Sequence, residues 1–179
     1  MAAVVALATQ AAPQTEAVAE VSKVSQGFEV YIGLGANLGD AQATVKAAIV
    51  QISALPQTRL LRQSSLYQTA PLDAGGDDYI NAVVAVSSAL APLNLLHALQ
   101  NLEQQAGRQR PYRNAPRTLD IDILLYGGLS LDSPELTLPH PRMSERAFVL
   151  LPLAEIAPGL VKASALEQVS AQRVIRLES

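Results

Sequence analysis

The chain has 179 residues, of which 49% are hydrophobic and 16% are charged, a balance typical of one globular domain large enough to bury a core. Its net charge of −3 argues against binding nucleic acid or an anionic membrane through a general basic excess. Cysteine is absent, which excludes disulfides and a cysteine nucleophile, and two histidines leave little material for a zinc site. No apolar run reaches the roughly 18 residues that a membrane-spanning helix needs.

Residues 1–28 are rich in Ala, Val, Gln and Ser, with Lys23 as their only basic residue. This composition matches neither a signal peptide, which begins with positive charge, nor an arginine-rich transit peptide. We therefore predict a flexible N-terminal extension, either a mobile tail or an irregular helix, without a role in chemistry and followed by a single domain over residues 29–179.

Periodic patterns predict alternating strands and helices along the rest of the chain. After Asp40, an expected N-cap, apolar residues recur at helical spacing, and Pro92 opens a second segment of this kind. The predicted elements are a strand at 29–36, a helix at 41–55, strands at 58–69 and 79–88, a helix at 92–106, a strand at 118–126, a short segment near 136–138 and a helix at 144–155. This β-α-β-β-α-β order predicts an α+β fold, a ferredoxin-like sandwich with helices packed on a mainly antiparallel sheet of four strands.

Glycines at the first strand-to-helix junction have the spacing G-x-G-x-x-x-G, from Gly33 to Gly39. This spacing differs by one residue from the dinucleotide-binding fingerprint. We interpret the glycines as a tight turn with close backbone packing; the alternative is a supporting role for Gly35 or Asn37 at the edge of a site.

Two carboxylates, Asp120 and Asp122, lie inside an otherwise apolar run that has strand character. Side chains at i and i+2 of a strand share a face, so these carboxylates point the same way, with Cα atoms roughly 6–7 Å apart. Two anions so close repel each other and resist burial. Binding of one or two magnesium ions would remove the repulsion and offset the cost of burying the charges.

Arginines are concentrated around this strand. Six of the ten in the chain fall between positions 108 and 146, a window without lysine: Arg108, Arg110, Arg113, Arg117, Arg142 and Arg146. The planar guanidinium binds phosphate oxygens in a bidentate manner, although a charged loop can also be merely solvated. An acidic pair for a metal beside a basic cluster for phosphate is typical of phosphoryl transfer, and the chain has no P-loop.

These segments resemble the 6-hydroxymethyl-7,8-dihydropterin pyrophosphokinase family of folate biosynthesis. The resemblance covers about residues 29–160 and is most specific in PRTLDIDILLYG (116–127) and LPHPRMSERAFVLLPLAEIAP (138–158). It implies a ferredoxin-like fold and a magnesium-dependent transferase that moves pyrophosphate from ATP to the hydroxymethyl group of the pterin, releasing AMP. It also implies small-molecule substrates, no nucleic acid or membrane partner, and a monomer in the cytoplasm.

Site residues follow from the same resemblance. Asp120 and Asp122 are similar to the ligands of two magnesium ions. The catalytic set that the resemblance implies is Arg108, Arg110, Asp120, Asp122 and His140. The implied ATP-binding set is Gln100, Glu103, Arg110, Arg117, Ile123, Thr137, His140 and Arg146. The implied pterin-binding set is Thr69, Ala70, Leu72, Tyr79, Asn81 and Phe148.

Some of these positions also have ordinary structural interpretations. Taken alone, Glu103 would be solvated surface on an exposed helix face, Phe148 a core residue, and His140 a brace for a turn. The chain departs from the family at Asn114, where the best-known members have a loop tryptophan. Two alternative functions are a non-catalytic ferredoxin-like module that binds a nucleotide or another small ligand and, less favoured by the acidic balance and few aromatic residues, a nucleic-acid-binding module.

Overall fold

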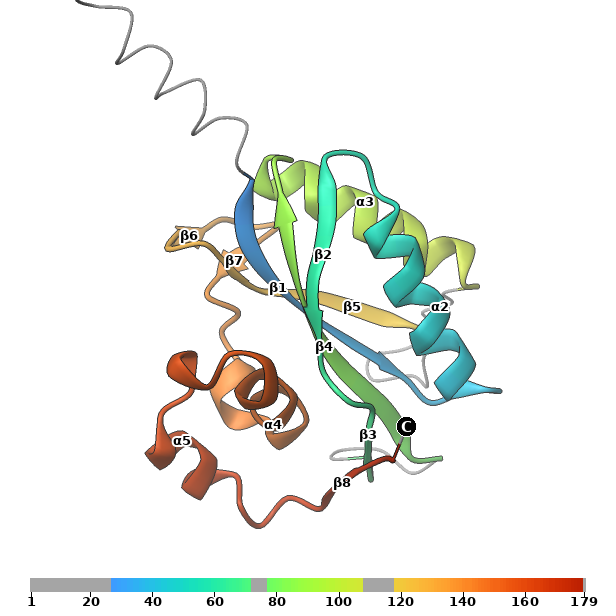
Figure 1. Ribbon diagram of the computed structural model, residues 1–179, viewed down its shortest axis with the longest axis vertical. Coiled ribbons are helices and arrows are strands. Elements are labelled where there is room, and N and C mark those ends of the chain that lie inside the picture. The colour runs from blue at the N-terminus through green and yellow to red at the C-terminus, as the bar shows by residue number, and fades with distance from the viewer. Residues whose placement is uncertain (1–26, 72–76, 108–117, 179) are drawn as a thin grey trace, which may run out of the picture.

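The computed structural model describes residues 27–71, 77–107 and 118–178. A sheet separates two layers of helices, with α2 and α3 on one face and α4 on the other (Figure 1). The elements are β1 (Phe28–Ala36), α2 (Ala41–Ser53), β2 (Thr58–Gln63), β3 (Tyr67–Thr69), β4 (Tyr79–Ser88), α3 (Pro92–Gln105), β5 (Asp120–Tyr126), β6 (Leu131–Asp132), β7 (Thr137–Leu138), η1 (Met143–Glu145), α4 (Ala147–Ile156), η2 (Pro158–Leu160), α5 (Ala163–Gln168) and β8 (Val174–Arg176). Within these described ranges, no helix combines the length and the hydrophobicity that crossing a bilayer requires.

The main sheet has the strand order β5-β1-β4-β3-β8, and β2 also pairs with β4. Every pairing is antiparallel, so the predicted ferredoxin-like α+β fold is confirmed. The sheet is larger than the four strands expected, because the chain adds β8 beside β3 and divides the strand predicted at 58–69 into two. The division falls after β2, where the Ser64 hydroxyl accepts the Val83 N–H at 3.0 Å in place of a backbone carbonyl.

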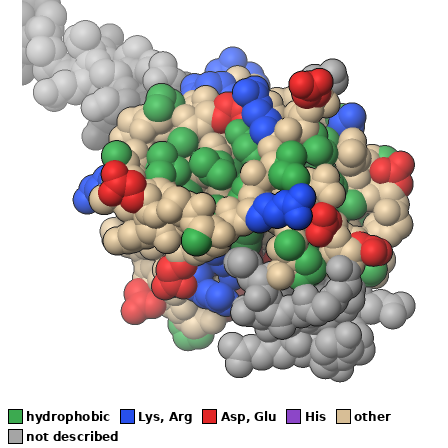
Figure 2. Space-filling model, turned by 90° about the horizontal axis from the view of Figure 1, so that it is seen from below, with side chains coloured by type: hydrophobic (Ala, Val, Ile, Leu, Met, Phe, Trp, Pro, Cys, Tyr) green, Lys and Arg blue, Asp and Glu red, His purple; other side chains and the backbone are tan. Residues whose placement is uncertain are grey.

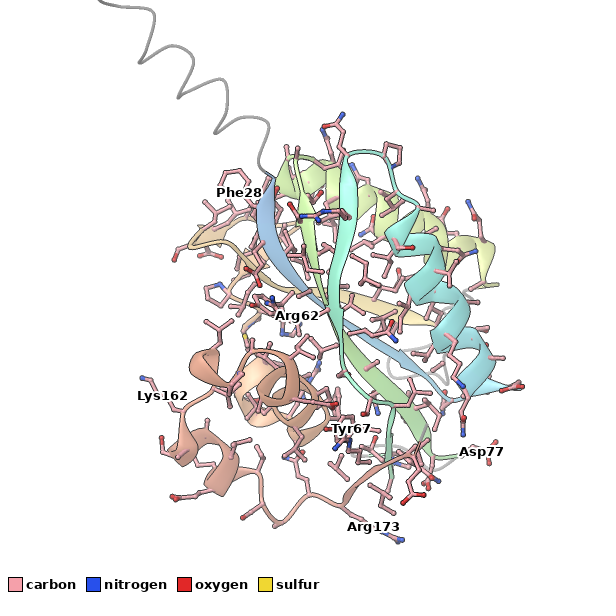
Figure 3. All side chains as sticks on the ribbon, viewed as in Figure 1. Phe28, Arg62, Tyr67, Asp77, Lys162 and Arg173 are labelled. Carbon is pink, nitrogen blue, oxygen red and sulfur yellow. The ribbon has the colours of Figure 1, made fainter. Side chains whose placement is uncertain are left out.

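Side chains alternate along β1, so this strand contributes to the hydrophobic core on each face of the sheet. Val30, Ile32 and Leu34 face α2 and α3, while Tyr31 faces α4 together with Val83 and Leu124. Side chains fill the space between the sheet and the α2–α3 layer (Figure 3). The central strands β1, β4 and β5 are therefore mostly buried, and a cavity opens on the α4 face of the sheet.

Helix boundaries differ slightly from the sequence prediction. The Asp40 cap is confirmed, since its Oδ1 accepts the Ala43 N–H at 3.0 Å, and α2 ends at Ser53. The helix predicted from 144 starts instead at Ala147, because Arg146 is extended (φ −121°, ψ 110°) after a 3-10 turn. The strand predicted from 29 starts at Phe28, and residues 1–26 of the predicted extension lie outside the described part of the chain.

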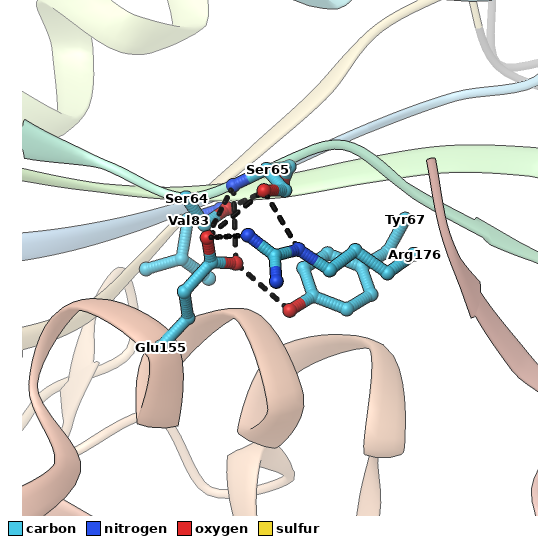
Figure 4. A network of polar contacts seen from close by, with 6 residues as sticks. All are labelled: Ser64, Ser65, Tyr67, Val83, Glu155 and Arg176. Carbon is cyan, nitrogen blue, oxygen red and sulfur yellow. Dashed lines mark hydrogen bonds and ion pairs between the residues drawn. The ribbon is translucent and has the colours of Figure 1, made fainter. Parts of the chain in front are cut away.

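A polar cluster ties the C-terminal part of the chain to the sheet, and we call it the Glu155 network: Ser65, Tyr67, Glu155 and Arg176 (Figure 4). The Glu155 carboxylate accepts hydrogen bonds from the Ser65 hydroxyl at 2.9 Å, the Tyr67 hydroxyl at 2.8 Å and the Arg176 Nη2 at 3.0 Å. The Ser65 backbone N–H also donates to it at 3.1 Å. One carboxylate on α4 thus joins the segment around β3 to β8.

The Glu155 network predicts a pH-dependent stability. Burial would raise the pKa of Glu155, but hydrogen bonds from Tyr67 and Ser65 and the charge of Arg176 outweigh it and lower the pKa below its ordinary 4.5. Stabilisation by a carboxyl with a lowered folded-state pKa is complete above 4.5 and is lost as the pH falls through the folded-state value. Glu155→Gln should therefore melt several degrees below the wild type at neutral pH, since about 1 kcal/mol corresponds to about 2–4 °C in a domain of this size.

Melting temperatures measured from neutral to acid pH check this prediction. The difference between wild type and Glu155→Gln should shrink as the medium becomes more acidic than pH 4.5. Glu167→Gln is the matched control, because Glu167 is an exposed residue of α5. A difference for Glu155→Gln that stays constant with pH would contradict the assigned role of its charge.

Candidate active site

The two carboxylates of β5 lie on the sheet face that α4 covers. Asp120 and Asp122 are half-buried and line the same cavity, as their i, i+2 spacing predicts. Ile121 and Ile123 point to the opposite face and are buried in the core with α2 and α3. The Ile123 side chain, implied to bind ATP, is therefore turned away from the carboxylates, which leaves its backbone as the part nearest to them.

The floor of the cavity is made by glycines of β1. Gly33 is paired with Asp122 of β5, and Gly35 is paired both with Asp120 and with Asn81 of β4. A Cβ atom at Gly35 would come within 3.0 Å of the Asn81 Oδ1, whereas one at Gly33 would make ordinary contact with Leu124 at 3.5 Å. The glycines thus keep open the space between the carboxylates and Asn81, which agrees with the alternative interpretation of Gly35 as a site-edge residue.

Away from the carboxylates, β3 and β4 on one side and α4 on the other supply surfaces suited to a flat ring. The buried Asn81 amide donates to the Thr69 hydroxyl at 2.9 Å, which fixes the amide orientation. Tyr79 and Phe148 add aromatic surface, and Phe148 also packs against the α4 core. The cavity volume is about 160 Å³. For comparison, an apolar cavity of about 150 Å³ takes up benzene.

Basic side chains stand beside the carboxylates. The Arg146 Nη1 is 4.0 Å from the Asp122 Oδ2, and its guanidinium lies 5.5 Å from the centre of the Phe148 ring, a cation–π contact. Arg142 also lines the cavity. Through these two contacts, Arg146 connects the acidic side of the cavity to its aromatic side.

On the face seen in Figure 2, the described basic and acidic side chains are interspersed with apolar ones.

His140 approaches Asp122 from the segment after β7, with its Nε2 3.9 Å from the Asp122 Oδ2. The backbone N–H of Arg142 donates to its Nδ1 at 3.2 Å, which assigns the proton of the neutral ring to Nε2. Burial lowers the pKa of His140, and the charges of Arg146 and Arg142 add to this against the opposing pull of Asp122. The ring is thus a neutral donor directed toward the carboxylates.

Of the residues implied to bind the nucleotide, Glu103 differs most from its expected environment. The surface interpretation of Glu103 was wrong: the residue is 1% exposed, and its Oε1 accepts the Ile121 N–H at 2.9 Å. The Glu103 carboxylate thus anchors β5 at Ile121, the residue between Asp120 and Asp122. Gln100 is exposed on α3, and the Thr137 hydroxyl is 3.4 Å from the Asp132 Oδ1.

The cavity collects about half of the implied residues. It brings together Thr69, Ala70, Tyr79, Asn81, Asp120, Asp122, Arg146 and Phe148, with His140 beside them. It is not lined by Gln100, Glu103, Ile123 or Thr137. Leu72, Arg108, Arg110 and Arg117 lie outside the described residues, as do Arg113 and Asn114. Sequence reasoning did not assign Gly33, Leu34, Pro71, Ala82, Leu124 and Val149, which also line it.

The donor set at β5 fits magnesium. Magnesium prefers oxygen ligands and is commonly held by one or two carboxylates together with substrate phosphates and water. Asp122 is 41% exposed, so its oxygens can reach such a shared ion. Within the described ranges there is no group of three or more His, Asp or Glu side chains that would form a site from protein ligands alone. The pair therefore suits an ion that arrives with a polyphosphate.

Paired carboxylates beside guanidinium groups, next to a pocket for a flat ring, are the arrangement of an enzyme that transfers phosphate groups to a small acceptor. Residues 31–158 match the model of the 7,8-dihydro-6-hydroxymethylpterin-pyrophosphokinase family. A 2-amino-4-hydroxy-6-hydroxymethyldihydropteridine pyrophosphokinase of Pseudomonas aeruginosa is 48% identical over 132 residues, covering 73% of this chain and 82% of the relative. The enzyme of the same name from Bacillus subtilis is 38% identical over 135 residues, covering 74% and 80%. The chain belongs to this pyrophosphokinase family.

Solved structures agree with the fold. An HPPK-DHPS protein crystallised with substrates has a TM-score of 0.57 at 15% identity, and the match covers 79% of this chain and 42% of that one. The wild-type HPPK-DHPS protein of Plasmodium falciparum with pteroate has a TM-score of 0.58 at 13% identity, covering 72% and 38%. The chain thus spans about two fifths of the length of these solved proteins, and at such identities the likeness concerns the fold alone.

Proposed function

We propose that the cavity between β5 and α4 is where this enzyme transfers pyrophosphate from ATP to 6-hydroxymethyl-7,8-dihydropterin, giving AMP and the pterin diphosphate of folate biosynthesis. Membership of the family makes the chain a transferase and favours the catalytic function over a non-catalytic binding module. The observation that supports this location most is that Asp120 and Asp122 share one cavity with Asn81 and Phe148.

The pterin side of the proposal rests on the wall around Asn81. A pterin ring is flat and has amide-like donors and acceptors along one edge, so it needs an aromatic face and a fixed polar partner. Phe148 and Tyr79 offer the faces, and Asn81, held by Thr69, offers the partner. Ala70 lines the same wall. Leu72, implied by the family resemblance, stays a proposal for the loop outside the described residues.

The ATP side of the proposal rests on β5 and its basic neighbours. Asp120 and Asp122 would hold two magnesium ions, which would neutralise phosphate charge and orient the triphosphate when bound. Arg146 and the Nε2 proton of His140 would donate to phosphate oxygens. Arg108, Arg110, Arg117, Gln100, Glu103, Thr137 and the backbone of Ile123 are further proposed contacts that the family resemblance implies.

In the proposed reaction, the pterin hydroxyl oxygen forms a bond to the β-phosphorus and releases its proton to water, while the bond from that phosphorus to the oxygen shared with the α-phosphorus breaks and that oxygen leaves with AMP. Among the described cavity-lining residues, the only carboxylates are Asp120 and Asp122. Both are proposed to hold magnesium, so neither is assigned as a general base. Positioning of the reactants and electrostatic stabilisation by Arg146 and His140 are therefore proposed to carry most of the rate enhancement. From the family resemblance, we also propose that the enzyme acts as a monomer in the cytoplasm.

A product assay tests the proposed function. Incubation with ATP, magnesium and the hydroxymethyl dihydropterin should give equal amounts of AMP and pterin diphosphate, and omission of either magnesium or pterin should abolish AMP formation. Formation of ADP instead would mean transfer of one phosphoryl group and would refute pyrophosphate transfer. Absence of turnover in the complete mixture would refute the enzymatic assignment.

The floor of the cavity gives a prediction of its own. Gly35→Ala places a methyl group 3.0 Å from the Asn81 Oδ1 and should displace the amide from its ligand. We expect the Kd for the pterin to rise about tenfold, the loss of about one hydrogen bond of roughly 1.4 kcal/mol. Binding of a non-hydrolysable ATP analogue should change little.

Gly33→Ala is the matched control for Gly35→Ala. Its methyl group would lie 3.5 Å from Leu124, an ordinary packing distance, so its effect on the pterin Kd should be clearly smaller. Calorimetric titration of both variants with the pterin makes the comparison. Equal effects, or a larger effect of Gly33→Ala, would show that crowding of Asn81 is not what limits the site.

A further inference from the structure

The cavity has two walls that are contributed by elements far apart in the chain. One wall is the end of β3 with Thr69, and the other is the start of α4 with Phe148 and Val149. A planar ligand between them is sensitive to their separation, because a gap of about 0.5–1 Å beyond the optimum already loses roughly a quarter to a half of the contact energy. Any group that fixes β3 relative to α4 therefore bears on ligand affinity.

The Glu155 network joins the same two elements. Tyr67 precedes Thr69 by two positions on β3, so the two side chains share a strand face. Glu155 follows Phe148 by seven positions, about two helical turns, so they share the face of α4 toward the sheet. The hydrogen bond between the Tyr67 hydroxyl and Glu155, at 2.8 Å, thus joins the same two elements as the ligand site, earlier along β3 and later along α4.

Arg176 completes the connection from β8, which lies beyond residues 31–158 of the family match. Its Nη2 donates to Glu155 at 3.0 Å and its Nε donates to the Ser65 hydroxyl at 2.9 Å. β8 also pairs with β3, with Tyr67 opposite Arg176 and Thr69 opposite Val174. The short strand that carries Thr69 is therefore held between β4 and β8.

We propose that Glu155 and Arg176 are positioning residues for the pterin site: through Tyr67 and Ser65 they fix the spacing between the Thr69 wall and the Phe148 wall. The inference rests on the proposed function and extends it, because it gives the C-terminal strand a role in acceptor affinity. Neither residue lines the cavity, so the effect is transmitted through β3 and α4.

The chain contains a matched control of the same chemistry. Glu29, Tyr31 and Arg62 form a second Glu–Tyr–Arg group, in which the Tyr31 hydroxyl donates to Glu29 at 2.6 Å and Arg62 is hydrogen-bonded to both. It joins β1 to β2, and none of its members lines the cavity. Arg62→Ala should therefore reduce stability in the same way as Arg176→Ala without moving either wall.

The test compares Arg176→Ala, Arg176→Lys, Glu155→Gln and Arg62→Ala in the full chain. Calorimetry gives Kd for the hydroxymethyl dihydropterin and for a non-hydrolysable ATP analogue with magnesium, and melting temperatures report stability. We expect Arg176→Ala and Glu155→Gln to raise the pterin Kd about five- to tenfold. The ATP-analogue Kd, and kcat at saturating pterin, should change less than about twofold, and Arg176→Lys should recover part of the pterin affinity.

The possible outcomes test the positioning role of Glu155 and Arg176 separately from the proposed function. Arg62→Ala should leave the pterin Kd within about twofold of the wild type at a comparable loss of melting temperature. Equal pterin shifts in Arg62→Ala and Arg176→Ala, or an unchanged pterin Kd in Arg176→Ala and Glu155→Gln, would overturn the positioning role alone. A wild-type protein that does not bind the pterin would overturn the proposed function and this inference with it.

Discussion

Asp122→Asn is expected to lower kcat about a thousandfold or more, because it removes one of the two carboxylates proposed to hold magnesium. Loss of about 4 kcal/mol of charge stabilisation in the transition state corresponds to this factor. The fold should be unaffected, since Asp122 is 41% exposed and an asparagine is nearly isosteric with it. Steady-state AMP formation and a thermal melt, on the same preparation, measure both effects.

Asp40→Asn is the control for this substitution. It changes the charge of the chain by the same amount at the N-cap of α2, where asparagine is as good a cap as aspartate. Its kcat should equal that of the wild type. A near-wild-type rate for Asp122→Asn in magnesium and ATP would refute the metal assignment at β5.

The second large effect is expected at Asn81, which is 4% exposed and lies between Thr69 and Gly35. Asn81→Leu keeps the number and branching of the side-chain heavy atoms but replaces both polar ends with larger methyl groups. We expect the pterin Kd to rise about a hundredfold, because a polar edge of the ligand would be buried against an apolar group at a cost of about 2–3 kcal/mol. Binding of the ATP analogue with magnesium should be preserved.

Thr69→Val distinguishes direct contact by Asn81 from a purely structural bond. It removes the hydroxyl that accepts from the Asn81 amide but leaves the amide in place. The affinity for the pterin, measured by calorimetry, should fall less in Thr69→Val than in Asn81→Leu. If the two variants lose equal affinity, Asn81 acts only through its bond to Thr69, and the proposed contact with the pterin is wrong.

The acidic pair was predictable because its geometry is local. Two aspartates at i, i+2 in an apolar strand must share a face, and the structure places both in one cavity. The glycine floor was less accessible from sequence. Gly33 and Gly35 also share a face, but their position beside the aspartates depends on the pairing of β1 with β5, which no local pattern specifies.

Other features were hidden for a similar reason. The burial of Glu103 depends on its bond to the Ile121 backbone, a contact between α3 and β5 that its helical position does not reveal. β8 has only three residues, two of them exposed, so it has no alternation to detect. At the break between β2 and β3, the Ser64 hydroxyl accepts the Val83 N–H, a contact between distant segments that the strand pattern does not reveal.

Calorimetry with a non-hydrolysable ATP analogue tests most directly whether β5 holds a metal-bound triphosphate beside the pterin pocket. In the wild type, the analogue should bind tightly only with magnesium, whereas the pterin should bind Asp122→Asn as it binds the wild type. Asp122→Asn should lose the magnesium-dependent part of analogue binding. Equal analogue affinity with and without magnesium, or equal magnesium-dependent affinity in wild type and Asp122→Asn, would contradict the assignment of this cavity.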